Sequence, residues 1–189
     1  MALDRPDWLL EVAAPARAAA LSLATMPAQS DSTPIIREAQ PSDVDTVFDL
    51  ILALAEYERL RHRVRGTREL LEMALFGPRR HAEAVIAELD SAPVGFALFF
   101  HTFSTFVCRP GLWLEDLFVV PEQRRSGIGR ALLAHVASVA VKRGCARLEW
   151  SVLSWNDPAL SFYAALGAET MSDWRTLRLD GAALRALGG

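Results

Sequence analysis

The chain has 189 residues, 51% of them hydrophobic, and carries a formal net charge of −3 at pH 7. This length and apolar content suit one globular domain with its own core and exclude a chain that is disordered throughout. The charge offers no overall basic bias toward nucleic acid, and no stretch reaches the ~20 apolar residues that span a bilayer. Neither nucleic acid nor a membrane is therefore expected as a partner.

Cysteine and histidine are too sparse for a disulfide framework or a metal site. The two cysteines, Cys108 and Cys145, predict reduced thiols and a cytoplasmic location. The histidines show no metal-ligand spacing, so no metal is expected.

Residues 1–33 differ from the rest of the chain, being rich in Ala, Ser and Pro. Glu11, Pro15 and Arg17 interrupt the apolar run that a secretory signal needs. We expect a loosely ordered extension with room for one short helix near 7–24, followed by a domain over 34–189.

The first half of this domain predicts strands and helices in turn. Residues 33–39 are predicted as a strand, and apolar side chains at three- and four-residue steps predict a helix from Pro41 to about residue 58. Thr67 begins a shorter helix that ends near Gly77. Three strands follow, the first two joined as a hairpin, at 82–89, 94–103 and 112–120.

The second half repeats helix and strand. A helix is predicted over 128–143, a strand over 146–153, a helix from Asp157 to Gly167 and a last strand over 173–179. The predicted order is β-α-α-β-β-β-α-β-α-β, which is a single α/β domain with a mixed sheet.

The segment PEQRRSGIGRALL places two glycines among arginines directly before a predicted helix. A helix start carries unsatisfied N–H groups and a partial positive charge. Gly127 and Gly129 would let an anion approach these N–H groups, and three arginines add charge: Arg124, Arg125 and Arg130. The segment therefore predicts a phosphate or pyrophosphate site.

Two common phosphate motifs do not match this segment. A Walker loop needs a Gly-Lys pair, which the chain lacks, and Leu132 stands where the third glycine of a Rossmann fingerprint would be. The pattern that remains is R-x-x-G-x-G, formed by Arg124, Gly127 and Gly129. An ordinary glycine-bearing turn before a helix is the alternative interpretation.

This pattern, with LEDLFVV before it and EWSVLSWNDPALSFYAALGA (149–168) after it, resembles the GCN5-related N-acetyltransferase (GNAT) superfamily. With LAEYE (54–58), the likeness is closest to the diamine (spermidine/spermine) and thialysine acetyltransferase group. The resemblance implies a mostly antiparallel mixed sheet flanked by helices, with splayed central strands that form an acyl-CoA slot. It also implies acetyl-CoA as acyl donor and a homodimer.

The resemblance places the cofactor against a strand end, the glycine loop and the start of a later helix. A strand end can pair its backbone with the amides of pantetheine, as an added strand would. The implied cofactor-binding residues are Phe118, Val119, Val120, Arg124, Arg125, Ser126, Gly127, Ile128, Gly129, Arg130, Asn156 and Ala159. Asp157 is expected to cap the helix, and many relatives carry Gly where this chain has Arg125.

By the same resemblance, Tyr163 is the catalytic acid. Amine attack on a thioester expels a thiolate, and a phenol of pKa ~10 can donate a proton to a thiolate whose acid has pKa ~8.5. A core aromatic residue on an amphipathic helix is the alternative interpretation of Tyr163.

Two adjacent acids, Glu115 and Asp116, lie in an otherwise apolar strand. Strand alternation sends them to opposite faces, so only one can face the slot unless a bulge intervenes. By resemblance, Glu115 is the second catalytic residue, which holds the amine and relays its proton. The implied substrate-binding residues are Tyr57, Glu58, Glu115, Asp116, Glu149 and Trp150.

The segment RLRHRVR (59–65) follows LAEYE directly in the chain and carries four arginines. If they line the site, they would repel a polyamine and suit a small amine that also carries a carboxylate, such as thialysine; a solvated basic loop is the alternative. The sequence therefore predicts transfer of an acetyl group from acetyl-CoA to the primary amine of a diamine, polyamine or thialysine-like amino acid. A protein or peptide acceptor and a non-catalytic acyl-CoA sensor are the alternatives.

Overall fold

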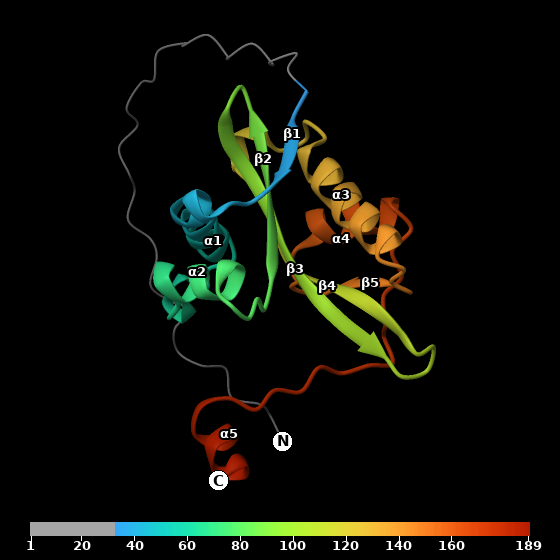
Figure 1. The fold of residues 1–189 in the computed structure, drawn as a ribbon. Coiled ribbons are helices and arrows are strands. Elements are labelled where there is room, and N and C mark those ends of the chain that lie inside the picture. The colour runs from blue at the N-terminus through green and yellow to red at the C-terminus, as the bar shows by residue number, and fades with distance from the viewer. Residues whose placement is uncertain (1–32) are drawn as a thin grey trace, which may run out of the picture. The chain divides into compact units, whose positions relative to one another are not determined.

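A five-stranded sheet forms the centre of the computed structural model, which describes residues 33–189. The predicted extension lies outside the described residues apart from Thr33. The strands lie in chain order across the sheet, with antiparallel neighbours except for the parallel pair β4 and β5 (Figure 1). Their bounds are β1 (Ile35–Glu38), β2 (Glu83–Leu89), β3 (Ala92–Ser104), β4 (Arg109–Val119) and β5 (Leu148–Trp150).

Helices cover both faces of this sheet. One face packs against α1 and α2, and the other packs against α3 and α4 (Figure 1). The helix bounds are α1 (Val44–Tyr57), α2 (Arg68–Phe76), α3 (Ile128–Lys142), α4 (Asp157–Ala165) and α5 (Gly181–Gly188). Short 3-10 turns are η2 (Pro41–Asp43), η3 (Arg61–Arg63) and η4 (Pro121–Gln123). Within the described range, no helix has the length and apolar content to cross a bilayer.

Strand alternation divides the core into two clusters. Phe96 and Leu98 of β3 face α1, whereas Ala97 and Phe99 face α3. Both faces are therefore buried, which explains the nearly continuous apolar sequence of the central strands. The β2–β3 hairpin turns through Asp90 and Ser91, whose φ angles of 51° and 66° match the turn geometry that follows the natural twist of two strands.

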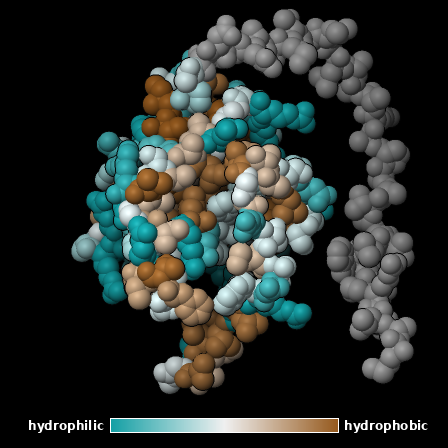
Figure 2. All heavy atoms as spheres, turned by 90° about the vertical axis from the view of Figure 1, so that its right-hand side faces the viewer, coloured by the Kyte–Doolittle hydropathy of each residue, from teal (hydrophilic) through white to brown (hydrophobic). Residues whose placement is uncertain are grey.

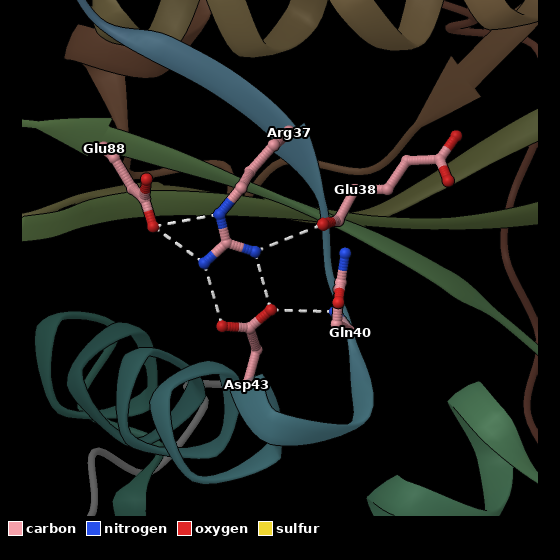
Figure 3. A network of polar contacts seen from close by, with 5 residues as sticks. All are labelled: Arg37, Glu38, Gln40, Asp43 and Glu88. Atoms are coloured by element: carbon pink, nitrogen blue, oxygen red, sulfur yellow. Dashed lines mark hydrogen bonds and ion pairs between the residues drawn. The ribbon is translucent and has the colours of Figure 1, made fainter. Parts of the chain in front are cut away.

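Arg37 joins β1 to its surroundings through a network of ion pairs (Figure 3). Its guanidinium donates to Asp43 at 2.6 and 2.9 Å and to Glu88 at 2.7 and 2.9 Å. The Arg37 guanidinium holds the pKa of Asp43 below its ordinary value. The network fixes the short edge strand to β2 and to the start of α1.

The prediction of a last strand over 173–179 is wrong. These residues are exposed and have no strand assignment, and Leu177 is 91% exposed. The alternation of Leu177 and Leu179 with polar residues resembles a strand, but within residues 33–189 no strand pairs with this segment. Helix α5 follows, and it was not predicted from the sequence. Figure 2 shows an apolar protrusion at the bottom of the domain, at the height of α5 in Figure 1.

Candidate active site

Strands β4 and β5 separate beside the site. They pair only from Leu112 to Leu114 on β4 and from Leu148 to Trp150 on β5. Beyond this point β4 continues to Val119, while the chain after Trp150 leaves the sheet. The backbone of residues 115–119 on that side therefore lacks a strand partner, which is what an added extended ligand requires.

The glycine loop closes one end of this slot. Gly127 has a φ of 87°. A Cβ added there would meet nothing within 4 Å, so the position that a side chain would occupy is open space. No side chain caps the start of α3, which leaves its first N–H groups available. Arg125 adopts a φ of 65°, the left-handed region that glycine enters more easily. The loop therefore presents uncapped N–H groups to open space, and we call this segment, Arg124–Arg130, the cradle.

Gly129 stands where three elements meet. A Cβ added there would lie 3.8 Å from Val119 of β4 and 4.0 Å from Phe162 of α4. These are ordinary contact distances, so the fold itself would accept a small side chain at this position. The cradle, the end of β4 and helix α4 thus meet at Gly129.

A β-bulge at Glu115 decides where the adjacent acids lie. Leu98 of β3 pairs with Asp116, but Phe99 pairs with Leu114, so Glu115 is the extra residue. In regular alternation Asp116 would share the α3 face with Leu114. Because of the bulge, it lies opposite Leu98 on the α1 face instead.

Asp116 lies in a pocket between α1, η3 and β4. The pocket is a cavity of about 170 Å³ whose walls are mostly apolar. Its lining residues are Ile51, Leu54, Ala55, Glu58, Leu60, Arg63, Val64 and Asp116. We call it the acceptor pocket. Burial, followed by the charges of Glu115 and Glu58, raises the pKa of Asp116 to about 7. Burial also raises the pKa of Glu58.

Tyr163 lies on α4, packed between aromatic rings. Its ring centroid is 4.9 Å from that of Trp150 and 5.1 Å from that of Phe162. Burial and then the charge of Glu58 raise the pKa of Tyr163 to about 12. The phenol therefore stays protonated at neutral pH, and Glu58 acts electrostatically on both Tyr163 and Asp116.

Tyr57, at the end of α1, contacts the cradle and the start of α4. The guanidinium carbon of Arg124 lies 4.1 Å from the centroid of the Tyr57 ring, and Arg124 also donates to Val119 O at 3.1 Å. The Tyr57 hydroxyl donates to Asn156 Oδ1 at 3.3 Å. Tyr57 thus contacts two of the predicted cofactor-binding residues.

Asn156 is the N-cap of α4, since its Oδ1 accepts from the Ala159 N–H at 3.4 Å. The prediction that Asp157 caps this helix is therefore wrong; Asp157 is its first residue. Asn156 is only 9% exposed, and its two hydrogen bonds fix the start of α4 against α1.

Two predicted acids lie away from the acceptor pocket. The Glu115 carboxylate is exposed and accepts from Trp113 Nε1 at 2.8 Å. Glu149 pairs with Arg147 at 2.7 Å. The apolar wall of the pocket, including Leu60 and Val64, was not predicted as a site, because a short apolar stretch after a helix carries no functional signal by itself.

The comparisons with known proteins agree with this geometry. Residues 50–168 match the model of the Acetyltransferase (GNAT) family. The chain is 38% identical over 166 residues to a thialysine N-epsilon-acetyltransferase of Bos taurus, covering 82% of this chain and 97% of the relative. It is 31% identical over 197 residues to an L-ornithine N5-acetyltransferase of Arabidopsis thaliana, covering 80% of this chain and 86% of the relative.

Among solved structures, an integron cassette protein of V. cholerae superposes with a TM-score of 0.69 at 25% identity. That match covers 82% of this chain and 97% of the cassette protein. The chain therefore belongs to the GNAT acetyltransferase family, and the predicted resemblance and fold class are confirmed. It is an acyl-CoA-dependent N-acetyltransferase, similar over most of its length to thialysine N-epsilon-acetyltransferases.

Proposed function

We propose that the protein transfers the acetyl group of acetyl-CoA to a primary amine of a small molecule. The observation that carries this proposal is that Glu58, a residue of the acceptor pocket, acts electrostatically on both Asp116 and Tyr163, and that with burial it raises the pKa of each. The names of the relatives, which act on thialysine and L-ornithine, support an acceptor of small size.

The donor site is proposed at the cradle and the slot beside it. The start of α3 and the arginines of the cradle would hold the pyrophosphate, and the backbone at the end of β4 would pair with pantetheine. The open side of Gly127 and the missing β5 partner beyond Leu114 support this fit. The bound donor supplies the reactive thioester, while the chain supplies orientation, charge and proton transfer.

Asp116 takes the role that the sequence analysis gave to Glu115. Its carboxylate, with that of Glu58, would hold the acceptor as an ammonium ion and then accept a proton from it. A carboxylate with a pKa of about 7 is a better base near neutral pH than one of ordinary pKa. The exposed position of Glu115 and its bond to Trp113 support this exchange of roles.

Tyr163 would act as the general acid. The acceptor nitrogen would bond to the thioester carbonyl carbon as the carbon–sulfur bond breaks, and the Tyr163 hydroxyl would donate its proton to the leaving sulfur. The nitrogen would then release its remaining extra proton to solvent, and Tyr163 would regain a proton from solvent. The raised pKa keeps the phenol fully protonated at neutral pH, so the acid form is the resting form of Tyr163.

The test measures free CoA released from acetyl-CoA over a panel of thialysine, L-ornithine, putrescine, spermidine and a peptide. Tyr163→Phe keeps the ring and removes the acidic proton, so we expect turnover to fall by about 10²–10³. Affinity for CoA, measured by calorimetry, should stay within about twofold, since the aromatic packing is retained. Tight binding without release for any amine would contradict the proposed function.

We also propose a homodimer in the cytoplasm. The C-terminal segment exposes a set of apolar side chains, a surface that a second copy could cover: Trp174, Leu177, Leu179, Leu184 and Leu187. Both cysteines are free, as a reducing compartment favours. Light scattering of the purified chain tests the dimer, and a monomer at micromolar concentration would contradict it.

A further inference from the structure

Helix α1 forms one side of the acceptor pocket and gives it two ends. Four residues of this helix line the cavity at steps of three and four along the chain: Ile51, Leu54, Ala55 and Glu58. These steps bring side chains to one face of a helix. Ile51 and Glu58 are two helical turns apart, which is about 10 Å along the helix axis.

The negative charge of the pocket lies at the Glu58 end. Glu58 and Asp116 are the acidic lining residues, and the charge of Glu58 acts both on Asp116 and on Tyr163, the proposed general acid. The reacting amine is therefore expected at this end. At the other end, the lining residues of α1 are apolar: Ile51, Leu54 and Ala55.

The loop after α1 offers no partner for a second cation either. Leu60 and Val64 flank η3 and add apolar surface to the pocket, whereas Arg63 is exposed. All four arginines of this loop lack an ion pair among the described residues: Arg59, Arg61, Arg63 and Arg65. A second cation on the acceptor would thus meet apolar side chains inside the pocket and positive charge on the loop that lines it.

The gain from a hydrocarbon chain in this pocket can be compared with the cost of a second cation. An apolar cavity of about 150 Å³ holds a benzene ring, so the pocket, at about 170 Å³, has room for a chain of about six carbon atoms. Each methylene group that leaves water should strengthen binding about three- to fourfold. A second amine of pKa ~10.4 must lose its proton to be buried without a partner, which costs up to about 100-fold near pH 8.

We propose that Ile51 is a specificity-determining residue that excludes a second cation from the far end of the acceptor pocket. The acceptor then lies with its primary amine at Glu58 and Asp116 and with a hydrocarbon chain toward Ile51. This inference rests on the proposed function and specifies how that site chooses among amines. Diamines and polyamines are the acceptors that it disfavours.

The test compares acceptors that differ only in the second amine. Hexylamine and 1,6-diaminohexane form one such pair, and butylamine and putrescine form a second. For the unmodified protein at pH 8, kcat/KM should be about 10- to 100-fold higher for the monoamine of each pair. It should also rise about three- to fourfold per methylene group from propylamine to hexylamine, mainly through KM.

Ile51→Glu places a carboxylate at the far end of the pocket. It should lower kcat/KM for hexylamine by about tenfold and raise kcat/KM for 1,6-diaminohexane, so that the preference shrinks or reverses. Ile51→Gln has a similar size without the charge and should lower the value for hexylamine without raising that for the diamine. Ala53→Glu is the matched control, because Ala53 lies on the same helix but is exposed and outside the pocket lining. It should leave the preference unchanged.

Ile51→Ala gives a second test, since Ile51 also packs against the core and Ile51→Glu can cost stability. This variant lengthens the apolar end of the pocket. Octylamine should gain about threefold or more relative to hexylamine, as one further buried methylene group predicts. The preference for hexylamine over 1,6-diaminohexane should remain.

The outcomes separate this inference from the proposed function. A kcat/KM for 1,6-diaminohexane equal to or above that for hexylamine in the unmodified protein would overturn the role of Ile51. The same conclusion would follow from equal preferences in Ile51→Glu and Ala53→Glu, or from acetylation of thialysine or putrescine without acetylation of any alkylamine. Failure to acetylate every amine tested, thialysine and L-ornithine included, with acetyl-CoA bound, would instead overturn the small-amine function itself.

Discussion

The cradle and the acceptor pocket are built in opposite ways, although both adjoin β4. The cradle is one continuous segment, and the groups it offers are mainly backbone N–H groups at the start of α3. The acceptor pocket is lined by residues from α1, η3 and β4, and its Glu58 also acts electrostatically on Tyr163 of α4. From this difference we expect donor binding to depend on local backbone geometry and acceptor choice to depend on a few side chains.

If the cradle binds the donor and the acceptor pocket binds the acceptor, the two sites can be changed separately. Substitutions in the pocket should alter kcat and the acceptor KM, and substitutions in the cradle should alter the donor KM. The largest effect is expected in the pocket, from Asp116→Asn. Because the base is lost, kcat/KM for the acceptor at pH 8 should fall by about 10²–10³. The donor KM should stay within about twofold. A large rise in the donor KM would show that the two regions are not separable.

The same substitution gives a pH test. The unmodified enzyme should gain kcat/KM as the pH rises through about 7, where Asp116 loses its proton. Asp116→Asn should lack this step. Tyr163 has a pKa of about 12 and should give no loss below pH ~10. If the rise in kcat/KM near pH 7 persists in Asp116→Asn, the titrating group is a residue other than Asp116.

The free energy of unfolding should fall as the pH rises through about 7, whereas kcat/KM should rise. The folded pKa of Asp116, about 7, exceeds its ordinary value of 3.8, so the folded state binds the proton more tightly than the unfolded state does. The resulting stability is complete below the ordinary pKa and is lost as the pH rises through about 7. Asp116→Asn should therefore unfold at higher urea concentration than the unmodified protein at pH 8, with a small difference at pH 4.

The difference between the cradle and the acceptor pocket also explains which parts of the site could be predicted from the sequence. The cradle was predictable because two glycines, several arginines and a helix start are adjacent in the chain. The position of Asp116 was not, since the bulge at Glu115 reverses the expected faces and leaves no sequence signal. The strand predicted over 173–179 failed for a related reason, because alternation alone does not say whether a neighbouring strand exists.

The second-largest effect on catalysis is expected in the cradle. Gly127→Ala places a Cβ in the open space beside the first N–H groups of α3 and strains a φ of 87°. We expect the donor KM to rise by about tenfold and the free energy of unfolding to fall by about 1 kcal/mol. Gly167→Ala is the matched control, because Gly167 has a similar φ of 84° and also open surroundings. It should lose similar stability without changing the donor KM.

The smallest effect is expected at Tyr57, which precedes the pocket residue Glu58 in the chain but contacts the proposed donor residues Arg124 and Asn156. It therefore tests where the boundary between the two regions lies. Tyr57→Phe removes the hydrogen bond to Asn156 but keeps the ring beside Arg124. The donor KM should rise by about two- to fivefold, as the loss of one neutral hydrogen bond predicts. Tyr57→Leu also removes the ring and should raise the donor KM by about a further threefold, the contribution of a partly exposed cation–π contact.

Because both partners of Tyr57 are proposed donor contacts, the acceptor KM should change less than the donor KM in each variant. A larger change in the acceptor KM would place Tyr57 in the acceptor pocket, and the boundary would then run between Tyr57 and Arg124.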